Sequence, residues 1–349
     1  MDTNKHSRST VYNEITSAEK MKLVNRDNIQ LGEDFLEYLA SVDRAPTTIR
    51  QYQSNLNIFW CWNLDYNKNK SFTDITKREA VKFQNMAINE WGWSPRRVRT
   101  FKATLRSMEN YIMDILDDEF PNYKKIWNRI ESPADEAVRE KSIFTDDDIQ
   151  QLLDTLVAKK KYELACYLAL AVFSGRRKAE LTRFKVAYFD DTNLICDGAL
   201  YKTPEKMVTK GRGQRGKLLD VYTLAKPFRP YFDLWMTRRN ELGVDSEWLF
   251  PKWRDGNMNE HITGTTIDSW SRQLTRIAGK QMYPHSLRHF FTTHLAQQGI
   301  PDDVIKDIVG WKDISLVSIY KDIDAEDNFE KYFGAEGIKQ VEQASLSDL

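Results

Sequence analysis

Two short segments near the end of the sequence combine residue types that can do covalent chemistry. His285 and Arg288 lie three residues apart where a helical pattern begins, so their side chains should share one face. Tyr320 follows Trp311 by nine residues. A tyrosine hydroxyl can act as a nucleophile when a base or cationic surroundings offset its pKa of about 10. Histidine can relay the proton, and guanidinium groups can stabilise anionic oxygens in a transition state without a metal.

A third segment, residues 174–181, adds a second arginine and a carboxylate. It reads Ser-Gly-Arg-Arg-Lys-Ala-Glu-Leu, and its first two residues, Ser174 and Gly175, are expected to stop a helix. Arg177 follows this stop, and Glu180 lies one helical turn further on. We expect Glu180 to orient or neutralise the nearby arginines.

Two other patterns resemble metal sites but have simpler interpretations. His285, His289 and His294 are spaced along one segment, yet no glutamate follows the first as in the zinc motif His-Glu-x-x-His. We interpret His289 and His294 as structural. Thr145 with the acids at 146–148 matches a helix N-cap followed by an acidic first turn. The three cysteines fit neither a disulfide framework nor a zinc site, and no Walker-type glycine loop occurs, so we expect no metal and no cofactor.

The elements that must position these residues are mostly helical. An apolar helix runs to about Phe173. Residues 188–189, 190–193 and 194–196 indicate a strand, a turn and a strand. A glycine-rich turn at 211–216 is flanked by 208–209 and 218–222, and helices fill the rest. The second half should therefore be mainly helical with a small antiparallel sheet.

The first third of the chain also has helical periodicity. Ile49, Tyr52, Leu56 and Phe59 recur at three- and four-residue steps. The clearest helix follows Ser94-Pro95, and it carries basic residues unmixed with acids: Arg96, Arg97, Arg99, Lys102 and Arg106. Cations near a helix N-terminus oppose the helix dipole, which favours contact with a polyanion. A solvated charged face is the alternative.

Length and charge add further constraints. At 349 residues the chain exceeds what one hydrophobic core usually covers, which indicates two domains joined by the polar segment from Glu131 to Ser142. The formal net charge is +0, but the tail from Asp322 sums to −6 and residues 1–321 to +6. No stretch approaches the roughly 18 apolar residues of a membrane span. The start lacks a signal-peptide core, so we expect a cytoplasmic protein.

Together these motifs resemble the tyrosine recombinases, the family of phage integrases and Xer-like recombinases. One family signature is Ser/Thr-Gly-x-Arg-x-x-Glu-Leu, and the other is His-x-x-Arg, then Gly-Trp or Gly-His, then a tyrosine nine residues later. The resemblance implies a pocket around one DNA phosphate with Tyr320 as nucleophile, whose other members are Arg177, Lys210, His285, Arg288 and Trp311. Arg176 stands where the family usually has an apolar residue. Lys202 and Lys206 are alternatives to Lys210 as the acid that protonates the leaving oxygen.

The resemblance also implies a fold and a domain plan. The expected fold is mainly α with a small antiparallel β-sheet, arranged as a two-domain C-shaped clamp around a duplex. The parts would be an N-terminal extension (1–27), a helical, SAM-like core-binding domain (28–131), a linker (132–143), an α+β catalytic domain (144–324) and an acidic tail (325–349). Phe329, Tyr332 and Phe333 would give the tail a helix with an apolar edge. That edge would pack on its own domain or, as the resemblance implies, on a neighbouring protomer.

The function that the resemblance implies is site-specific DNA recombination by an integrase or transposase of a mobile element. A homotetramer would bind paired core sites on double-stranded DNA and exchange strands through 3′-phosphotyrosine intermediates and a Holliday junction. It would need neither metal nor ATP, and it would be associated with the nucleoid. Phage integrase and resident resolvase are the other roles open to it. A type IB topoisomerase is the alternative enzyme, and a DNA-binding protein without catalysis is the alternative outside enzymes.

Overall fold

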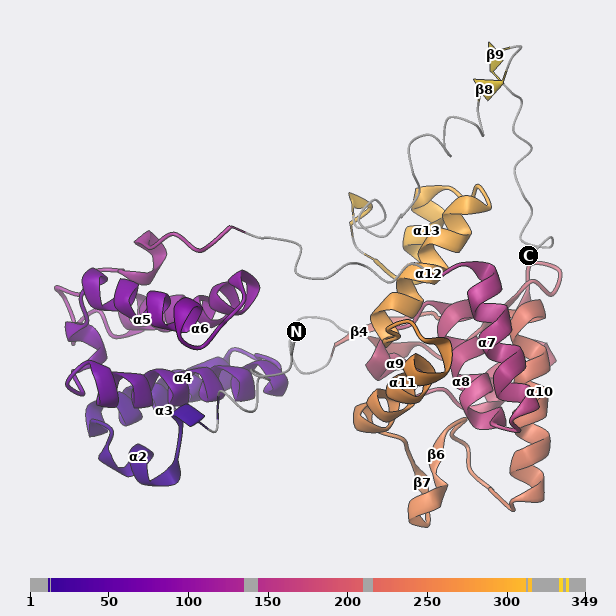
Figure 1. Ribbon diagram of the computed structural model, residues 1–349, viewed down its shortest axis with the longest axis horizontal. Coiled ribbons are helices and arrows are strands. Elements are labelled where there is room, and N and C mark those ends of the chain that lie inside the picture. The colour runs from indigo at the N-terminus through magenta and orange to yellow at the C-terminus, as the bar shows by residue number, and fades with distance from the viewer. Residues whose placement is uncertain are drawn as a thin grey trace. The chain divides into compact units, whose positions relative to one another are not determined.

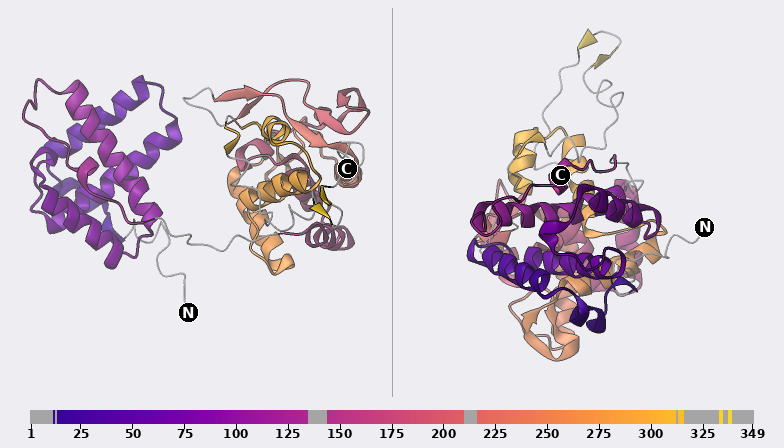
Figure 2. Two further views of the ribbon diagram at one scale, coloured as in Figure 1. Left: turned by 90° about the horizontal axis from the view of Figure 1, so that it is seen from above. Right: turned by 90° about the vertical axis from the view of Figure 1, so that its left-hand side faces the viewer.

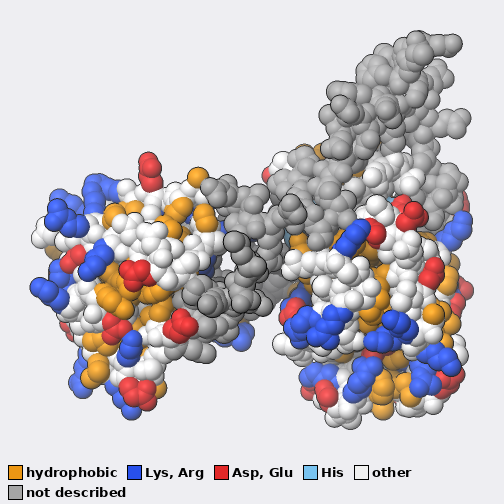
Figure 3. Space-filling model, viewed as in Figure 1, with side chains coloured by type: hydrophobic (Ala, Val, Ile, Leu, Met, Phe, Trp, Pro, Cys, Tyr) orange, Lys and Arg blue, Asp and Glu red, His pale blue; other side chains and the backbone are white. Residues whose placement is uncertain are grey.

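The structure is a computed structural model that describes residues 12, 14–134, 144–209, 216–311, 313–315, 333–334 and 337–338. It divides into two compact units, one before residue 135 and one after residue 143 (Figure 1). None of the described helices has the length and apolar character that crossing a bilayer requires. On the face that Figure 3 shows, basic and acidic side chains are intermixed on each unit. Neither unit therefore has a uniformly basic surface on this face.

The N-terminal unit is helical and has an aromatic core. Its helices include α2 (Ala18–Leu23), α3 (Arg26–Ser41), α4 (Pro46–Tyr66), α5 (Lys77–Asn89) and α6 (Pro95–Ile115). Phe59 and Phe83 lie at the centre, and their ring centroids are 5.3 Å apart. Trp62 and Trp127 pack against both rings at centroid distances between 5.0 and 6.1 Å. Contacts of this kind stabilise a core beyond the burial of apolar area.

Helix α6 confirms the helix predicted after Ser94-Pro95. The Ser94 hydroxyl accepts a hydrogen bond from the backbone N–H of Arg97 at 3.2 Å, which satisfies one of the free amides of the first turn. Its apolar residues at three- and four-residue steps are buried from Val98 through Ile112. One face of α6 therefore belongs to the core, and its basic stripe lies beside that face.

The C-terminal unit is built around α8 (Tyr162–Ser174), whose side chains are nearly all buried. Helices α7 (Asp146–Ala158), α10 (Ala225–Glu241) and α12 (Pro284–Gln297) pack against it, and Figure 1 shows α7, α8 and α10 side by side. Further helices are α9 (Lys178–Leu181), α11 (Gly264–Ala278) and α13 (Asp302–Val309). The predicted cap of α7 is confirmed, because the Thr145 hydroxyl accepts from the Asp148 N–H at 3.1 Å.

Short antiparallel sheets complete this unit, as predicted, and the strands between residues 194 and 224 lie to one side of its helices in the left view of Figure 2. A three-stranded sheet has the order β1 (Leu194–Ile195), β2 (Leu200–Lys202), β5 (Tyr222–Leu224). Strands β3 (Met207–Thr209) and β4 (Lys217–Leu219) form a hairpin in which Thr209 is opposite Lys217. Strands β6 (Pro251–Lys252) and β7 (Asn257–His261) form another pair.

The strand predicted at residues 188–189 is wrong. Residues Val186–Phe189 form a 3₁₀ turn, and β1 pairs with β2 instead. The ring of Phe189 lies 4.6 Å from that of Phe228 and 5.3 Å from that of Phe232, both on α10. A short apolar run fits either a strand or a buried turn, and here packing against α10 selects the turn.

The helix predicted in the tail is also wrong at Phe333. Phe333–Gly334 (β8) pairs antiparallel with Gly337–Ile338 (β9), with Phe333 opposite Ile338. Glycine is a poor helix former and is common in tight turns, so the two glycines favour this hairpin over a helix. Phe329 and Tyr332 lie outside the described residues.

Candidate active site

The site is built on the turn that ends α8. Gly175 is the C-cap of this helix, and its φ of +59° lies in the left-handed region. A Cβ atom at this position would lie 2.2 Å from Cδ1 of Phe291 on α12. Glycine is therefore the residue that fits, and the helix ends where the sequence predicts. The turn carries Arg176 and Arg177 at the end of α8.

Arg177 and Glu180 form an ion pair across the short helix α9. The Nη1 atom of Arg177 lies 3.1 Å from Oε1 of Glu180, and the backbone N–H of Arg177 donates to Oε2 at 3.1 Å. The side chain of Glu180 is 2% exposed, whereas that of Arg177 is 32% exposed. The carboxylate therefore anchors a guanidinium that reaches solvent, which is the orienting contact expected of Glu180.

Arg288 approaches the same turn from α12. Its Nη1 donates to the carbonyl of Gly175 at 2.8 Å, and its Nη2 donates to the carbonyl of Val309 at 3.1 Å. The residue is 1% exposed. Its guanidinium carbon lies 5.1 Å from the ring centroid of Trp311, which is also buried and follows the C-cap of α13. The structure thus brings Arg288 and Trp311 into contact, next to the turn that carries Arg177.

His285 lies in the first turn of α12, one helical turn before Arg288. It is exposed, and its ring meets that of His289 edge to face at a centroid distance of 5.2 Å. His294, further along α12, lies 3.0 Å from the carboxylate of Asp146, which agrees with the structural role predicted for it. Within the described ranges, no cluster of three or more potential ligands could hold a metal ion.

Two members of the expected pocket, Lys210 and Tyr320, lie outside the described residues. The structure nevertheless places the residue that precedes Lys210. Lys210 directly follows Thr209, the last residue of β3, and β3 packs against α9. Of the alternative lysines, Lys202 is on β2 with its ammonium 3.9 Å from the Asp220 carboxylate, and Lys206 is exposed.

Arg176, which the sequence marks only as a departure from the family pattern, is a buried part of this region. It is 1% exposed, and burial lowers the pKa of its guanidinium to about 10. Its Nε donates to the carbonyl of Ser174 at 3.2 Å, and its Nη2 donates to the carbonyl of Ile308. Of the two adjacent arginines, the one that reaches solvent is therefore Arg177. The signal that could have indicated its burial is the apolar residue that the family usually has at this position.

The basic residues in the middle of α6 bond to the chain's own backbone. Lys102 is buried, and its ammonium donates to the carbonyls of Ile130 at 2.6 Å and Glu131 at 3.1 Å. Arg99 donates to the carbonyl of Pro133 at 2.8 Å, and Arg106 donates to a carbonyl of the same segment, Trp127, at 3.2 Å. These cations hold the chain's own segment 127–133, because backbone carbonyls require hydrogen-bond partners when a segment packs against the core.

The other two predicted DNA contacts lie at the start of α6. Arg97 is half-buried, with its guanidinium carbon 4.5 Å from the ring centroid of Trp93 and its Nη1 2.9 Å from Oδ1 of Asn55. Arg96 is exposed. Of the five basic residues, Arg96 is the one whose side chain is fully open to a partner.

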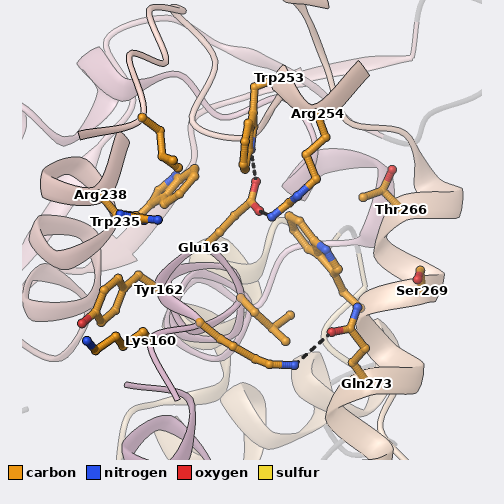
Figure 4. A pocket seen from close by; sticks show the side chains of 14 residues that line it. Lys160, Tyr162, Glu163, Trp235, Arg238, Trp253, Arg254, Thr266, Ser269 and Gln273 are labelled. Carbon is orange, nitrogen blue, oxygen red and sulfur yellow. Dashed lines mark hydrogen bonds and ion pairs between the residues drawn. The ribbon is translucent and has the colours of Figure 1, made fainter. Parts of the chain in front are cut away.

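A separate cavity of about 580 Å³ lies at the other end of α8 (Figure 4). Helix α8 has 13 residues, so this end is roughly 20 Å from the arginines. Glu163 lies at the centre of the cavity, and its carboxylate accepts from Nε1 of Trp253 at 3.0 Å and pairs with Arg254 at 2.5 Å. Burial raises the pKa of Glu163, which Arg254 partly offsets. The Glu163 carboxylate thus has hydrogen-bond and ion-pair partners within the cavity. None of these three residues belongs to the predicted pocket.

Comparisons with known proteins agree with this geometry. A family model described as "Phage integrase family" matches residues 142–327, more than half of the chain. The chain is 28% identical over 277 residues to the SPbeta prophage-derived recombinase-like protein YomM of Bacillus subtilis, covering 78% of this chain and 80% of that protein. It is 26% identical over 300 residues to the tyrosine recombinase XerD of Listeria innocua, covering 83% and 93%.

A solved structure shows the same fold. The Tn1549 transposon integrase in complex with circular intermediate DNA superposes with a TM-score of 0.62 at 14% identity, covering 86% of this chain and 97% of that one. The signature residues, their arrangement at the end of α8 and the family match agree. The chain therefore belongs to the phage integrase family, the tyrosine recombinases.

Proposed function

We propose that this chain is a site-specific recombinase that cleaves and rejoins DNA through a covalent bond between Tyr320 and a 3′ phosphate. The observation that carries the proposal is the meeting of Arg177 and Arg288 at the end of α8, beside Trp311. Arg177 pairs there with the carboxylate of Glu180, while Arg176 and Arg288 bond to backbone carbonyls of the same turn. The excess positive charge would be balanced by an anionic phosphate.

In the proposed reaction the hydroxyl oxygen of Tyr320 attacks phosphorus and loses its proton, and the bond from phosphorus to the 5′ oxygen breaks. Arg177 and Arg288 stabilise the negative charge on the non-bridging oxygens. His285 relays a proton at the phosphate, and Lys210 protonates the departing 5′ oxygen. Trp311 contacts the phosphate through its indole N–H. The phosphotyrosine keeps the energy of the broken bond, so a 5′ hydroxyl from another strand reverses the step without ATP or metal.

We favour Lys210 over Lys202 because of the strand that precedes it. Strand β3 packs against α9, the element that carries Glu180, and Arg183 donates to the carbonyl of Val208 at 3.0 Å. Strand β2, which carries Lys202, pairs with β1 and β5 instead. Lys210 is thus linked through packed elements to the turn that carries Arg176 and Arg177, whereas the strand of Lys202 packs against other elements.

The relatives favour a mobile element as the biological setting. YomM is named as prophage-derived, and the solved integrase belongs to a transposon. We propose that this chain acts as the integrase or transposase of such an element, in the cytoplasm at the nucleoid where its DNA lies. Its partners would be double-stranded DNA with paired core sites and three further copies of itself, and exchange would proceed through a Holliday junction.

A suicide substrate tests the chemistry. Wild-type protein incubated with a nicked core site from the element's ends should form a protein–DNA adduct that survives a denaturing gel, with or without EDTA. Tyr320→Phe should bind the same DNA equally well and form no adduct, because only the hydroxyl is lost. A persistent adduct in the variant would remove Tyr320 as nucleophile, and strict dependence on magnesium would indicate a metal mechanism. Relaxation of a supercoiled plasmid that lacks the site would favour the topoisomerase alternative.

Truncation tests the proposed assembly. Removing residues 326–349 should leave binding to a single site nearly intact and abolish complexes that pair two sites, because the tail is proposed to link neighbouring protomers. Paired-site complexes of the truncated protein in a native gel would show that the tail is not the connector.

A further inference from the structure

Two buried arginines join the same two helix ends. Arg176 bonds to the carbonyls of Ser174, the last residue of α8, and Ile308, in the last turn of α13. Arg288 bonds to the carbonyls of the residues that follow these two in the sequence, Gly175 and Val309. The end of α8 and the end of α13 are therefore connected by two parallel guanidinium bridges.

The chemistry of helix ends explains why arginine is suited to this place. The last four carbonyls of a helix have no partner within it and carry partial negative charge, so a cation there is favourable. A guanidinium also offers several N–H donors in a planar fork, which lets one side chain bond to two helices at once. Moving α13 away would leave both a buried cation and a buried carbonyl without partners, and each loss is costly.

The bridge of Arg176 acts directly on the segment that follows α13. Gly310 caps α13 with a φ of +75°, and a Cβ atom there would lie 3.5 Å from Nη1 of Arg176 and 2.9 Å from Cδ1 of Leu219. The guanidinium thus lies beside the turn that leads into Trp311. Trp311 in turn packs over Arg288, and Tyr320 follows nine residues later.

We propose that Arg176 is a positioning residue for the recombination reaction. It sets the end of α13, and through it Trp311 and the segment that carries Tyr320, while touching neither phosphate nor nucleophile. Because it duplicates the bridge of Arg288, α13 stays in place when Arg288 binds the phosphate. This inference rests on the proposed function, since it assigns Arg176 a part in that same chemistry.

A matched pair of substitutions tests it. Arg176→Leu removes the bridge and introduces the apolar residue type that the family usually has there. Arg239→Leu is the control, because Arg239 is also a buried arginine, 2% exposed, that bonds to backbone carbonyls, those of Ser246 at 2.8 Å and Leu249 at 2.9 Å. It lies on α10, away from the arginine cluster. Arg176→Lys keeps the positive charge but lacks the planar set of N–H donors of a guanidinium. This variant replaces Arg176→Leu in the test if the leucine variant does not fold.

Three measurements are made on the full-length proteins below the unfolding temperature of each variant. At saturating suicide DNA, Arg176→Leu should form the covalent adduct about 100-fold more slowly than wild type, the effect of a displacement of about 1 Å at a reacting centre, and Arg176→Lys should be intermediate. DNA affinity in a mobility-shift assay should be unchanged. Hydrogen exchange should accelerate at the amides of Gly310 and Trp311, which donate to carbonyls of α13. Arg239→Leu should change neither the adduct rate nor this exchange.

The outcomes separate the two proposals. A folded Arg176 variant with the wild-type adduct rate would overturn the positioning role, as would unchanged exchange at Gly310 and Trp311. An equal loss of rate in Arg239→Leu would show that the effect is general destabilisation, and would also overturn it. If wild-type protein forms no adduct, the proposed function fails, and the exchange measurement alone decides whether Arg176 holds α13.

Discussion

Replacing Gly175 with alanine should destabilise the C-terminal unit by roughly 2–5 kcal/mol. Two costs add. The left-handed backbone at φ +59° costs an L-residue about 1–2 kcal/mol. The new Cβ atom would also lie 2.2 Å from Cδ1 of Phe291, whose side chain is 1% exposed and has no open space to enter. Forcing an extra carbon into a packed core costs about 1–3 kcal/mol.

Gly279→Ala is the control for the backbone term. Gly279 caps α11 at a φ of +67°, and nothing lies within 4 Å of a Cβ atom built there. Its substitution should cost only about 1–2 kcal/mol, so the difference between the two variants isolates the contact with Phe291. The Gly175 variant should also lose adduct formation, because the turn that carries Arg177 must shift.

The full chain is unfolded in urea, and unfolding is monitored by hydrogen exchange in peptides from α8 and α12. This readout gives the free energy of unfolding of the C-terminal unit alone. Equal destabilisation by the two substitutions would refute the reasoning, because it would mean that Phe291 adjusts at no cost. A wild-type adduct rate in Gly175→Ala would show that the turn does not position Arg177.

Three further predictions concern single basic residues. If Lys210 is the general acid, Lys210→Ala should cleave an ordinary site poorly but recover on a 5′-bridging phosphorothiolate, whose sulfur leaves without a proton; recovery of Lys202→Ala instead would move the role. Burial lowers the pKa of Lys102 from 10.5 to about 8, so between these pH values the unfolded chain binds more protons and the free energy of unfolding should rise with pH. Urea denaturation across this range should show the rise in wild type and its loss in Lys102→Met; a parallel rise in both would contradict the assignment. Arg96→Ala should flatten the salt dependence of DNA binding by roughly one unit of slope, whereas Arg106→Ala, bonded to Trp127, should not; equal slopes for both variants would refute the distinction.

Local patterns predicted what depends on neighbours along the chain. The spacing of Val98 through Ile112 gives α6, and Ser94 gives its cap, because both depend on one helical turn. The stop at Gly175 and the pairing of Arg177 with Glu180 are likewise local. The meeting of Arg288 with this turn is not local, and it was expected only because the motifs resemble a known family.

For Lys102, Phe189 and Arg176 the environment depends on a partner that is distant in sequence. Lys102 has the pattern of a solvent-facing cation, but a segment about 30 residues away folds back to cover it. Phe189 lies in a short apolar run that is typical of a strand. It packs instead against Phe228 on α10, and the turn allows this contact. Arg176 stands where the family usually has an apolar residue, and its bond to the carbonyl of Ile308, far along the chain, explains how it can be buried there. In each case the residue type is compatible with two environments, and tertiary packing selects one.

The cations of α6 also determine where this protein can be divided for engineering. The polar linker predicted from Glu131 onward invites a fusion junction, yet Arg99, Lys102 and Arg106 bond segment 127–133 to the N-terminal unit. A chimeric recombinase that joined the N-terminal unit to another catalytic unit before residue 127 would remove both the carbonyl acceptors of Lys102 and the segment that covers it. A junction after Pro133 would transfer the helix and its bound segment as one module.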